Sequence, residues 1–325
     1  MLSAGTAHSE DIKIGLNIYS FEDMFLKRYR DALTFEAWKH GVKFFAADAN
    51  KSQRKQNNQV SEFIATHVNA LIISPVDRND VGDLINRAKR AFIPLVFINR
   101  EPPKEFLDQY KKSWYVGSDT SGAGTIAGGI LADYFKNHPE ADKNHDGKTQ
   151  YVILKGEKSH QDTQIVTERT LKALTDAGFE LDELAGDYAD WQKFKAVVKM
   201  QGFIYLARGV ENIEAIIANN DEMALGALMA IKIHKYNSGD PEKFIPIVGI
   251  DGNTEALEAI SKNEIIGTVL NDAETQAAAA MSIAVEASKG HEINEENIGF
   301  NIIDGKYIRV PCKKITHENY KEFLK

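Results

Sequence analysis

Short apolar runs alternate with amphipathic segments along the whole chain. The segments carry apolar side chains at helical spacing, as Phe63, Ile64 and Val68 do after Ser52. The runs are rich in β-branched residues and are typical of buried strands. They cover residues 13–19, 42–47, 70–76, 94–99, 114–117, 150–155, 215–218, 246–250 and 267–270. Strands that alternate with helices pair in parallel, so the pattern predicts an α/β fold with helices on both faces of mainly parallel sheets.

The length of the chain favours two lobes over one. A single hydrophobic core rarely grows to 325 residues, and the predicted strands fill two sheets better than one open sheet. We therefore expect two Rossmann-like lobes joined by a three-segment hinge, which would open and close around a ligand in the cleft between them. The expected N-terminal lobe covers residues 11–117 and 274–305, the C-terminal lobe covers 118–271 and 308–325, and residues 1–10 form a disordered N-terminus.

Composition narrows the classes of partner. The formal net charge of −8 argues against nucleic acid and anionic membranes, because either would need a basic face. Cys312 is the single cysteine, so no intrachain disulfide can form, and no nucleophile motif surrounds it. The most apolar helix candidate, residues 277–287, is far shorter than the roughly 20 residues that span a membrane.

Polar residues follow most predicted strands at their carboxyl ends, which is where ligands bind in open α/β sheets. They are Tyr19, Asp23, Asn99, Arg100, His160, Asp162, Asn220, Asp221, Asp251, Asn271 and Asp272. Singly, an Asp or Asn at such a place is more often a turn residue or a helix cap. As a set they predict a ligand rich in hydroxyl groups, because a planar carboxylate or amide can bind two neighbouring hydroxyls. Phe25 and Trp191 are the candidate rings to cover the apolar face of a pyranose.

Residues 142–150 have the spacing of a calcium-binding loop. Loop positions 1, 3, 5, 6, 7 and 9 are Asp142, Asn144, Asp146, Gly147, Lys148 and Gln150, with Lys148 acting through its carbonyl. Position 12 should supply a bidentate glutamate but is Ile153. Unless a carboxylate arrives from elsewhere, the stretch is only a turn rich in Asp and Asn. Glu214, at the start of another strand, is the candidate.

A sugar-acting enzyme is the main alternative from another functional class. Gly122, Gly124 and Ala127 have the spacing of a dinucleotide-binding loop, but polar residues 118–121 separate them from the strand and favour an ordinary helix start. His160 with Asp162 is the pair that such an enzyme would use. Because the polar residues are spread over two lobes and no catalytic pair stands out, we expect a binding protein and no enzyme.

Several motifs, in the same order, resemble those of the periplasmic glucose/galactose-binding proteins. These are type I periplasmic binding proteins that serve ABC transporters and chemotaxis as sugar receptors. The similarity covers residues 14–323. It rests on residues 18–25, 96–102, 114–117, 142–160, 217–221, 248–251 and 267–272.

The resemblance implies a sugar site and a calcium site. Phe25 and Trp191 would sandwich a hexose, glucose or galactose, and Tyr19 would stand at the mouth of the cleft. The hydroxyl groups would bind Asp23, Asn99, Arg100, His160, Asp162, Asn220, Asp251 and Asn271. A structural calcium ion would be held by Asp142, Asn144, Asp146, Lys148, Gln150 and Glu214.

The resemblance also implies partners and a location. A monomeric receptor would deliver its hexose to a membrane ABC permease, and a chemoreceptor is a further expected partner. We expect the protein in the periplasm, free or anchored as a lipoprotein, with its export signal absent from this chain. A receptor for a pentose or a furanosyl signal stays open as the alternative.

Two positions depart from the family pattern. Val166 stands where the family has an Arg, and Arg100 stands where it has a Lys. Loss of the Arg removes a charge-assisted hydrogen-bond donor, which is worth about 1.5–3 kcal/mol. Arg169, one turn further along the same predicted helix, is the expected substitute.

Overall fold

The computed structural model describes residues 12–324, which divide into two compact units. Unit 1 runs to Gly117 and resumes over Ala273–Val310, whereas unit 2 spans Ser118–Asp272 and resumes at Pro311. Residues 308–310 were expected in the C-terminal lobe but lie in unit 1, because Tyr307–Val310 is a strand of its sheet. The expected disordered segment 1–10 falls outside the described residues.

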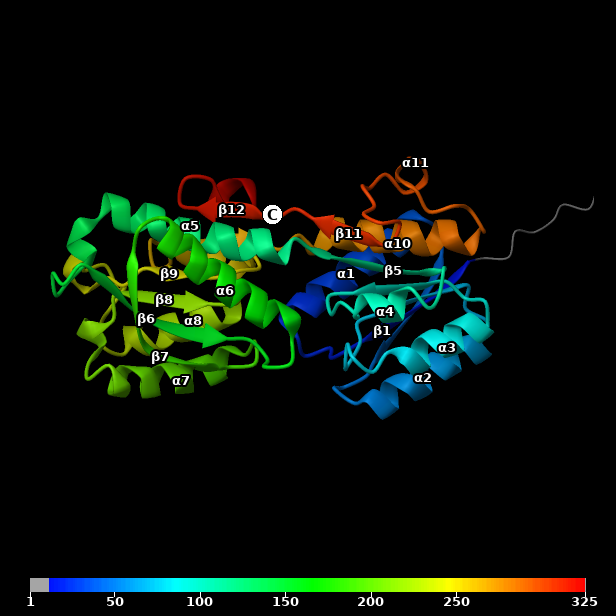
Figure 1. Cartoon of the computed structure of the whole chain (residues 1–325), viewed down its shortest axis with the longest axis horizontal. Helices are drawn as coiled ribbons and strands as arrows, with labels where there is room; N and C mark the ends of the chain where they lie inside the picture. The colour runs from blue at the N-terminus through cyan, green and yellow to red at the C-terminus, as the bar shows by residue number, and fades with distance from the viewer. Residues whose placement is uncertain (1–11, 325) are drawn as a thin grey trace, which may run out of the picture. The chain divides into compact units, whose positions relative to one another are not determined.

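Unit 1 is built on a six-stranded sheet in the order β11-β5-β4-β3-β1-β2. The pairs that join β1 to β5 are all parallel, so the carboxyl ends of these strands lie at one end of the sheet (Figure 1). The strands are β1 (Lys13–Ile18), β2 (Lys43–Asp48), β3 (Ala70–Ile73), β4 (Leu95–Ile98), β5 (Ser113–Ser118) and β11 (Tyr307–Val310).

Helices cover both faces of this sheet because successive strand residues point to opposite sides. Val96 and Ile98 of β4 pack in one buried cluster with α1 and α10, whereas Leu95 and Phe97 pack in another with α2 and α3. The helices are α1 (Met24–Lys39), α2 (Gln53–Ala65), α3 (Gly82–Arg90), α4 (Lys104–Leu107), α10 (Ala273–Ser288) and α11 (Glu295–Ile298).

Unit 2 repeats the plan with a six-stranded sheet in the order β12-β10-β9-β8-β6-β7, in which only the pair β10–β12 is antiparallel among the pairs described. The apolar runs do not predict β7, because it is an edge strand with many polar side chains and only one buried residue. The strands are β6 (Lys148–Lys155), β7 (Glu180–Tyr188), β8 (Ala215–Ala218), β9 (Ile247–Val248), β10 (Gly267–Leu270) and β12 (Lys313–Thr316).

The second sheet is also covered on both faces. Tyr151 and Ile153 of β6 pack with α5 and α6, whereas Val152 and Leu154 pack with α7 and α8. The helices are α5 (Thr120–Asn137), α6 (Gln161–Asp176), α7 (Lys193–Leu206), α8 (Asp221–Lys232) and α9 (Thr254–Ser261), with single 3₁₀ turns at Pro139–Ala141, Val210–Asn212, Pro241–Lys243 and Tyr320–Glu322. Across residues 12–324, no helix combines the length and the hydropathy needed to cross a membrane.

The glycine-rich stretch after residue 121 is the start of a helix, as expected. Asp119 caps α5 by accepting a hydrogen bond from the Gly122 amide at 3.1 Å. A Cβ atom at Gly124 would lie 2.8 Å from the Val166 carbonyl oxygen, and one at Gly128 would lie 2.4 Å from that of Thr170. The glycines therefore let α5 and α6 pack backbone to backbone.

Candidate functional site

In unit 1, Tyr19 and Arg100 form a stacked pair at the carboxyl ends of β1 and β4. The guanidinium carbon of Arg100 lies 3.7 Å from the centroid of the Tyr19 ring. Arg100 is 5% exposed, and its Nη1 donates a hydrogen bond to the Val76 carbonyl at 3.3 Å. The planar guanidinium can stack on the ring in a way that an ammonium group cannot. Two of the predicted sugar-binding residues are thus brought together.

Asp23 and Phe25 lie at the start of α1. Asp23 is the N-cap residue, and its Oδ1 accepts a hydrogen bond from the Leu26 amide at 2.8 Å. Phe25 is half-buried in the first turn and meets Tyr29 edge to face, with 6.0 Å between ring centroids. The simpler interpretation of Asp23 as a helix cap is therefore confirmed.

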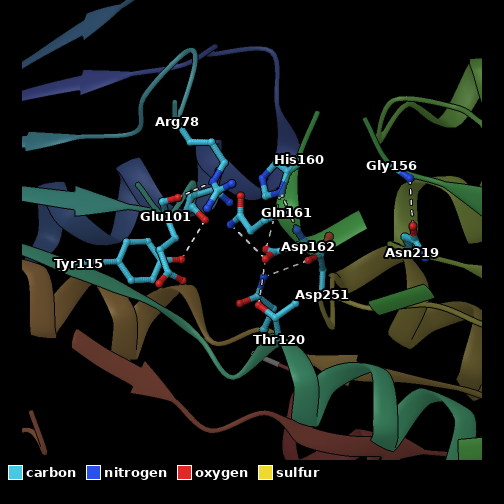
Figure 2. A network of polar contacts seen from close by, with 12 residues as sticks. Arg78, Glu101, Tyr115, Thr120, Gly156, His160, Gln161, Asp162, Asn219 and Asp251 are labelled. Carbon is cyan, nitrogen blue, oxygen red and sulfur yellow. Dashed lines mark hydrogen bonds and ion pairs between the residues drawn. The ribbon is translucent and has the colours of Figure 1, made fainter. Parts of the chain in front are cut away.

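A network that the sequence did not indicate holds the turn after β4 (Figure 2). The Tyr115 hydroxyl donates to the carbonyl of Asn99, whose φ of 61° is in the left-handed region. Arg78 donates to the Glu101 carbonyl at 2.5 Å, and Arg309 forms an ion pair with the Glu101 carboxylate at 2.6 Å. These contacts fix the backbone on both sides of Arg100.

In unit 2, Trp191 and His160 meet at the carboxyl ends of β7 and β6. Their rings lie edge to face, with centroids 5.3 Å apart. The His160 Nδ1 accepts a hydrogen bond from the Asp162 amide at 3.2 Å, so Nε2 carries the proton of the neutral ring and is a donor. A Cβ atom at Gly156 would lie 2.1 Å from the Trp191 ring. The indole therefore rests on bare backbone.

Asp162 is held from two sides at the start of α6, as Figure 2 shows. Its Oδ1 accepts hydrogen bonds from the Thr120 hydroxyl at 3.0 Å and from the Gln161 side-chain amide at 3.1 Å. Asn219, which sequence analysis passed over in favour of its neighbour, accepts from the Gly156 amide at 3.1 Å. These partners position Asp162 and the turn beneath Trp191.

The later strands of unit 2 bring together three further predicted residues. Asn220 caps α8 and lies 3.4 Å from the Trp191 carbonyl through its Nδ2. The side-chain amide of Asn271 donates to Asp251 Oδ1 at 3.4 Å. Asp221 is different, because it is fully buried and accepts hydrogen bonds from Thr268 and from the Asn253 backbone. Its role is to join α8, β10 and α9, so it is not available to a ligand.

Cys312 is not a nucleophile. Burial and the nearby carboxylates of Asp119, Asp162 and Asp251 raise the pKa of its thiol to about 12, so the thiol stays protonated at neutral pH. Its sulfur lies 3.6 Å from the Asp119 carbonyl. The cysteine packs beside the site and adds no covalent chemistry to it.

The loop 142–150 turns its oxygen atoms onto its own backbone. Asp142 accepts hydrogen bonds from the amides of Asp146 at 3.3 Å and Gly147 at 3.0 Å. Asp146 accepts from the Lys148 amide at 2.9 Å. Gly147 has a φ of 77°, which only the absence of a side chain makes inexpensive.

Glu214 and Gln150 join this loop from buried positions. Glu214 is 2% exposed and accepts hydrogen bonds from the amides of Lys143 at 2.6 Å and Gln150 at 3.1 Å. Burial raises the pKa of its carboxyl group. Gln150 donates to Asp146 at 2.8 Å, whereas its own buried Oε1 has no hydrogen-bond partner.

These residues fit a calcium ion. An orphaned buried oxygen and a desolvated carboxylate are both groups that a bound cation would satisfy, and calcium prefers oxygen ligands. Within the described residues, no three His, Cys, Asp or Glu side chains gather as a metal cluster. Amide and carbonyl oxygens, from Asn144, Lys148 and Gln150, would therefore have to share the coordination with the carboxylates.

The chain is similar to known binding proteins over nearly its whole length. It matches the model of the periplasmic binding protein domain over residues 14–292. It is 35% identical to the D-galactose/methyl-galactoside binding periplasmic protein of Haemophilus influenzae, over 99% of this chain and 95% of that protein. It is 30% identical to a putative rhizopine-binding protein of Rhizobium meliloti, over 99% and 95% of the two chains.

A similar solved structure is an ABC transporter solute binding protein of Bacillus halodurans with bound myo-inositol. Its TM-score is 0.80 at 28% identity, covering 98% of this chain and 99% of that one. A periplasmic solute binding protein of Actinobacillus succinogenes with bound D-allose has a TM-score of 0.81 at 21% identity, covering 96% and 100%. At that lower identity the likeness concerns the fold alone. The predicted fold of two mainly parallel α/β sheets is thus confirmed.

Proposed function

Because this chain belongs to the periplasmic binding proteins that serve ABC transporters as sugar receptors, we propose that its own ligand is a hexose, glucose or galactose. Members of the family are solute-binding proteins that act outside the cytoplasm. The relatives differ in ligand, since galactose, myo-inositol and allose all occur among them. The choice of a hexose therefore rests on the residues of this chain.

The observation that carries the proposal is the position of Trp191. Its indole lies against Gly156 and edge to face with His160, at the end of the sheet where Asp162, Asn220 and Asp251 also lie. A half-buried indole next to carboxylates and amides suits a pyranose, which has apolar C–H faces and a rim of hydroxyls. In unit 1, Phe25 would supply the other ring and Asp23, Asn99 and Arg100 further hydrogen bonds.

Binding energy would select the ligand-bound arrangement of the two units, which a membrane ABC permease would then recognise. Recognition by a chemoreceptor and attachment through a lipid anchor stay predictions. No catalytic step is needed for this activity, and the protonated Cys312 supplies none.

We also propose that a calcium ion stabilises the loop 142–150. Asp142, Asn144, Asp146, Gln150 and Glu214 would bind it through side chains and Lys148 through its carbonyl. The ion would neutralise buried negative charge and fix the start of β6, the strand that leads to His160. Its role would be structural, because β6 separates the loop from the residues proposed to bind sugar.

Titration calorimetry with a panel of sugars tests the ligand. We expect saturable binding of D-glucose or D-galactose, and weaker or no binding of D-xylose and D-ribose. Phe25→Ala and Trp191→Ala should each weaken hexose binding, because each removes a ring. Phe194→Ala removes a 75% exposed ring on α7 and should not weaken it. Absence of binding to every hexose would overturn the proposal.

A second ligand class is favoured by one substitution. Val166 is 4% exposed and packs in an apolar cluster, so this chain lacks the Arg of the glucose/galactose receptors. A ligand with a different pattern of hydroxyls, such as myo-inositol, a pentose or a furanose, would suit a site in which Val166 replaces that Arg. The panel should include these ligands, and tighter binding of any one would replace the hexose.

A further inference from the structure

A cavity opens in unit 2, at the other end of its sheet from Trp191. Its volume is about 1060 Å³, at the upper end for sites that hold small molecules. It is lined by the end of α5, by residues 237–244 before β9, and by residues 262–266 before β10. Because β8, β9 and β10 run parallel, this is the amino end of the sheet, and the predicted sugar-binding residues follow its carboxyl end.

One wall of the cavity is aromatic. The Tyr134 ring stacks on His138 with centroids 4.4 Å apart, and the centroid of the Phe244 ring lies 5.9 Å from that of Tyr134. All three are half-buried, so part of each ring stays accessible from the cavity. Burial raises the pKa of Tyr134 to about 12, so the phenol adds no charge at neutral pH. Such a wall can hold methylene groups and can attract cations through its π faces.

The remaining residues that line the cavity carry a net negative charge. Five carboxylates face two lysine ammonium groups, which gives the lining a net charge of −3 with neutral histidines; the carboxylates are Asp133, Glu140, Asp240, Glu264 and Glu318. Asp133 pairs with Lys314 at 2.6 Å, Glu140 with His138 at 2.9 Å, and Glu264 with Lys232 at 2.6 Å. Lys232 does not line the cavity, but even if its charge is added, the five carboxylates outnumber the three lysines.

Two helices add to this negative potential. Both α5 and α9 end at the cavity, with His138 and Lys262 as their C-cap residues. The free carbonyl groups of a last helical turn carry partial negative charge and favour cations. Anions and uncharged sugars gain nothing from this field.

We propose that this cavity binds a linear polyamine, whose methylene segments would pack on Tyr134 and Phe244 while its ammonium groups pair with the surrounding carboxylates. The spread of the carboxylates around one aromatic wall suits several charges in a row better than one compact cation. A triamine would balance the net charge of the lining. The inference is independent of the hexose proposal, since the two sites share no residue.

Titration calorimetry with spermidine, with the whole chain and with saturating galactose present, tests the site. We expect saturable binding that weakens as salt rises, because the contacts are charged and partly exposed. Glu140→Gln with Glu318→Gln removes two charges and keeps the shape, and should weaken binding about tenfold. The matched control, Glu168→Gln with Asp176→Asn on α6, makes the same charge change outside the cavity and should leave binding unaltered.

The aromatic wall is tested by a pair of substitutions at Tyr134. Tyr134→Phe keeps the ring and should retain spermidine binding, whereas Tyr134→Leu should weaken it about five- to thirtyfold. Thermal melting checks that both variants fold. The proposal is overturned if spermidine gives no saturable heat, if the α6 control weakens binding as much as the cavity variant, or if galactose competes with spermidine.

Discussion

The ring of Trp191 lies on the backbone of Gly156 so closely that even a methyl group would overlap it, at 2.1 Å. The amide of the same glycine donates to Asn219 at 3.1 Å. The glycine thus anchors the turn after β6 and leaves room for the indole. The position of the proposed stacking ring depends on a residue that has no side chain.

Replacing Gly156 with Ala should displace the Trp191 ring. We expect hexose affinity to fall about tenfold, since the stacking contact would be lost, and the free energy of unfolding to fall by about 1–3 kcal/mol from overpacking. Calorimetry and urea denaturation measure the two effects. Gly202→Ala in α7 is the control, because nothing lies within 4 Å of its added Cβ atom. Equal affinity in the Gly156 variant would contradict a stacking role for Trp191.

Arg100→Lys keeps the charge and loses the planar stack on Tyr19. We expect the free energy of unfolding to fall by about 1–2 kcal/mol, because a nearly buried cation–π contact at 3.7 Å disappears. Urea denaturation gives this value. Arg54→Lys on the exposed side of α2 should change stability by less than about 0.5 kcal/mol. If both variants lose the same stability, the stack contributes nothing specific.

Arg169 stays the predicted substitute for the Arg that the family has at Val166. It is exposed on α6, with its Cβ side facing Gly124 of α5. Arg169→Ala should weaken hexose binding about ten- to a hundredfold, the range for a lost charge-assisted hydrogen bond. Lys172→Ala, an exposed cation one turn further on, is the control. An unchanged dissociation constant for Arg169→Ala would refute the substitution.

Removal of calcium should destabilise the protein. At a hundredfold excess over its dissociation constant, a bound ion adds about 2.7 kcal/mol, so thermal melting with calcium should exceed that with a chelator by several degrees. Glu214→Gln should abolish this difference, whereas Glu168→Gln, an exposed residue on α6, should retain it. Identical melting of the unaltered protein under both conditions would mean that loop 142–150 is only a turn.

The periodic signals of the sequence predicted the fold well, because buried strands read as continuous apolar runs. Strand β7 was not predicted, because an edge strand needs no apolar side chains on its exposed face and so does not form a continuous apolar run. Residues 308–310 were assigned to the wrong lobe for a related reason. A four-residue strand pairs with whichever sheet its neighbours bring near, and nothing local encodes that choice.

The sequence pattern indicated candidate sugar-binding residues, but it did not indicate the residues that hold them in position. Polar residues after strands indicated Asp162, Asn220 and Asp251, yet Asp221 has the same signature and is a fully buried structural residue. Thr120, Asn219 and Gly156, which position Asp162 and Trp191, come from other parts of the chain and have no distinctive pattern of their own. Hydrogen bonds between distant segments decide which polar residues face a ligand. These bonds cannot be derived from the spacing of residues along the chain.

The assembly of each unit from two separate stretches has a consequence for synthesis. Strand β11 (Tyr307–Val310) joins the sheet of unit 1 beside β5 (Ser113–Ser118), and α10 (Ala273–Ser288), which helps to cover that sheet, also follows all of the intervening unit 2 segment. Unit 2 likewise receives β12 from the last residues of the chain. A nascent polypeptide therefore cannot complete the core of unit 1 before α10 and β11 have been synthesised, nor the sheet of unit 2 before β12 has been. A protein whose family works outside the cytoplasm benefits from this delay, because a translocase can still thread a chain that has not yet folded.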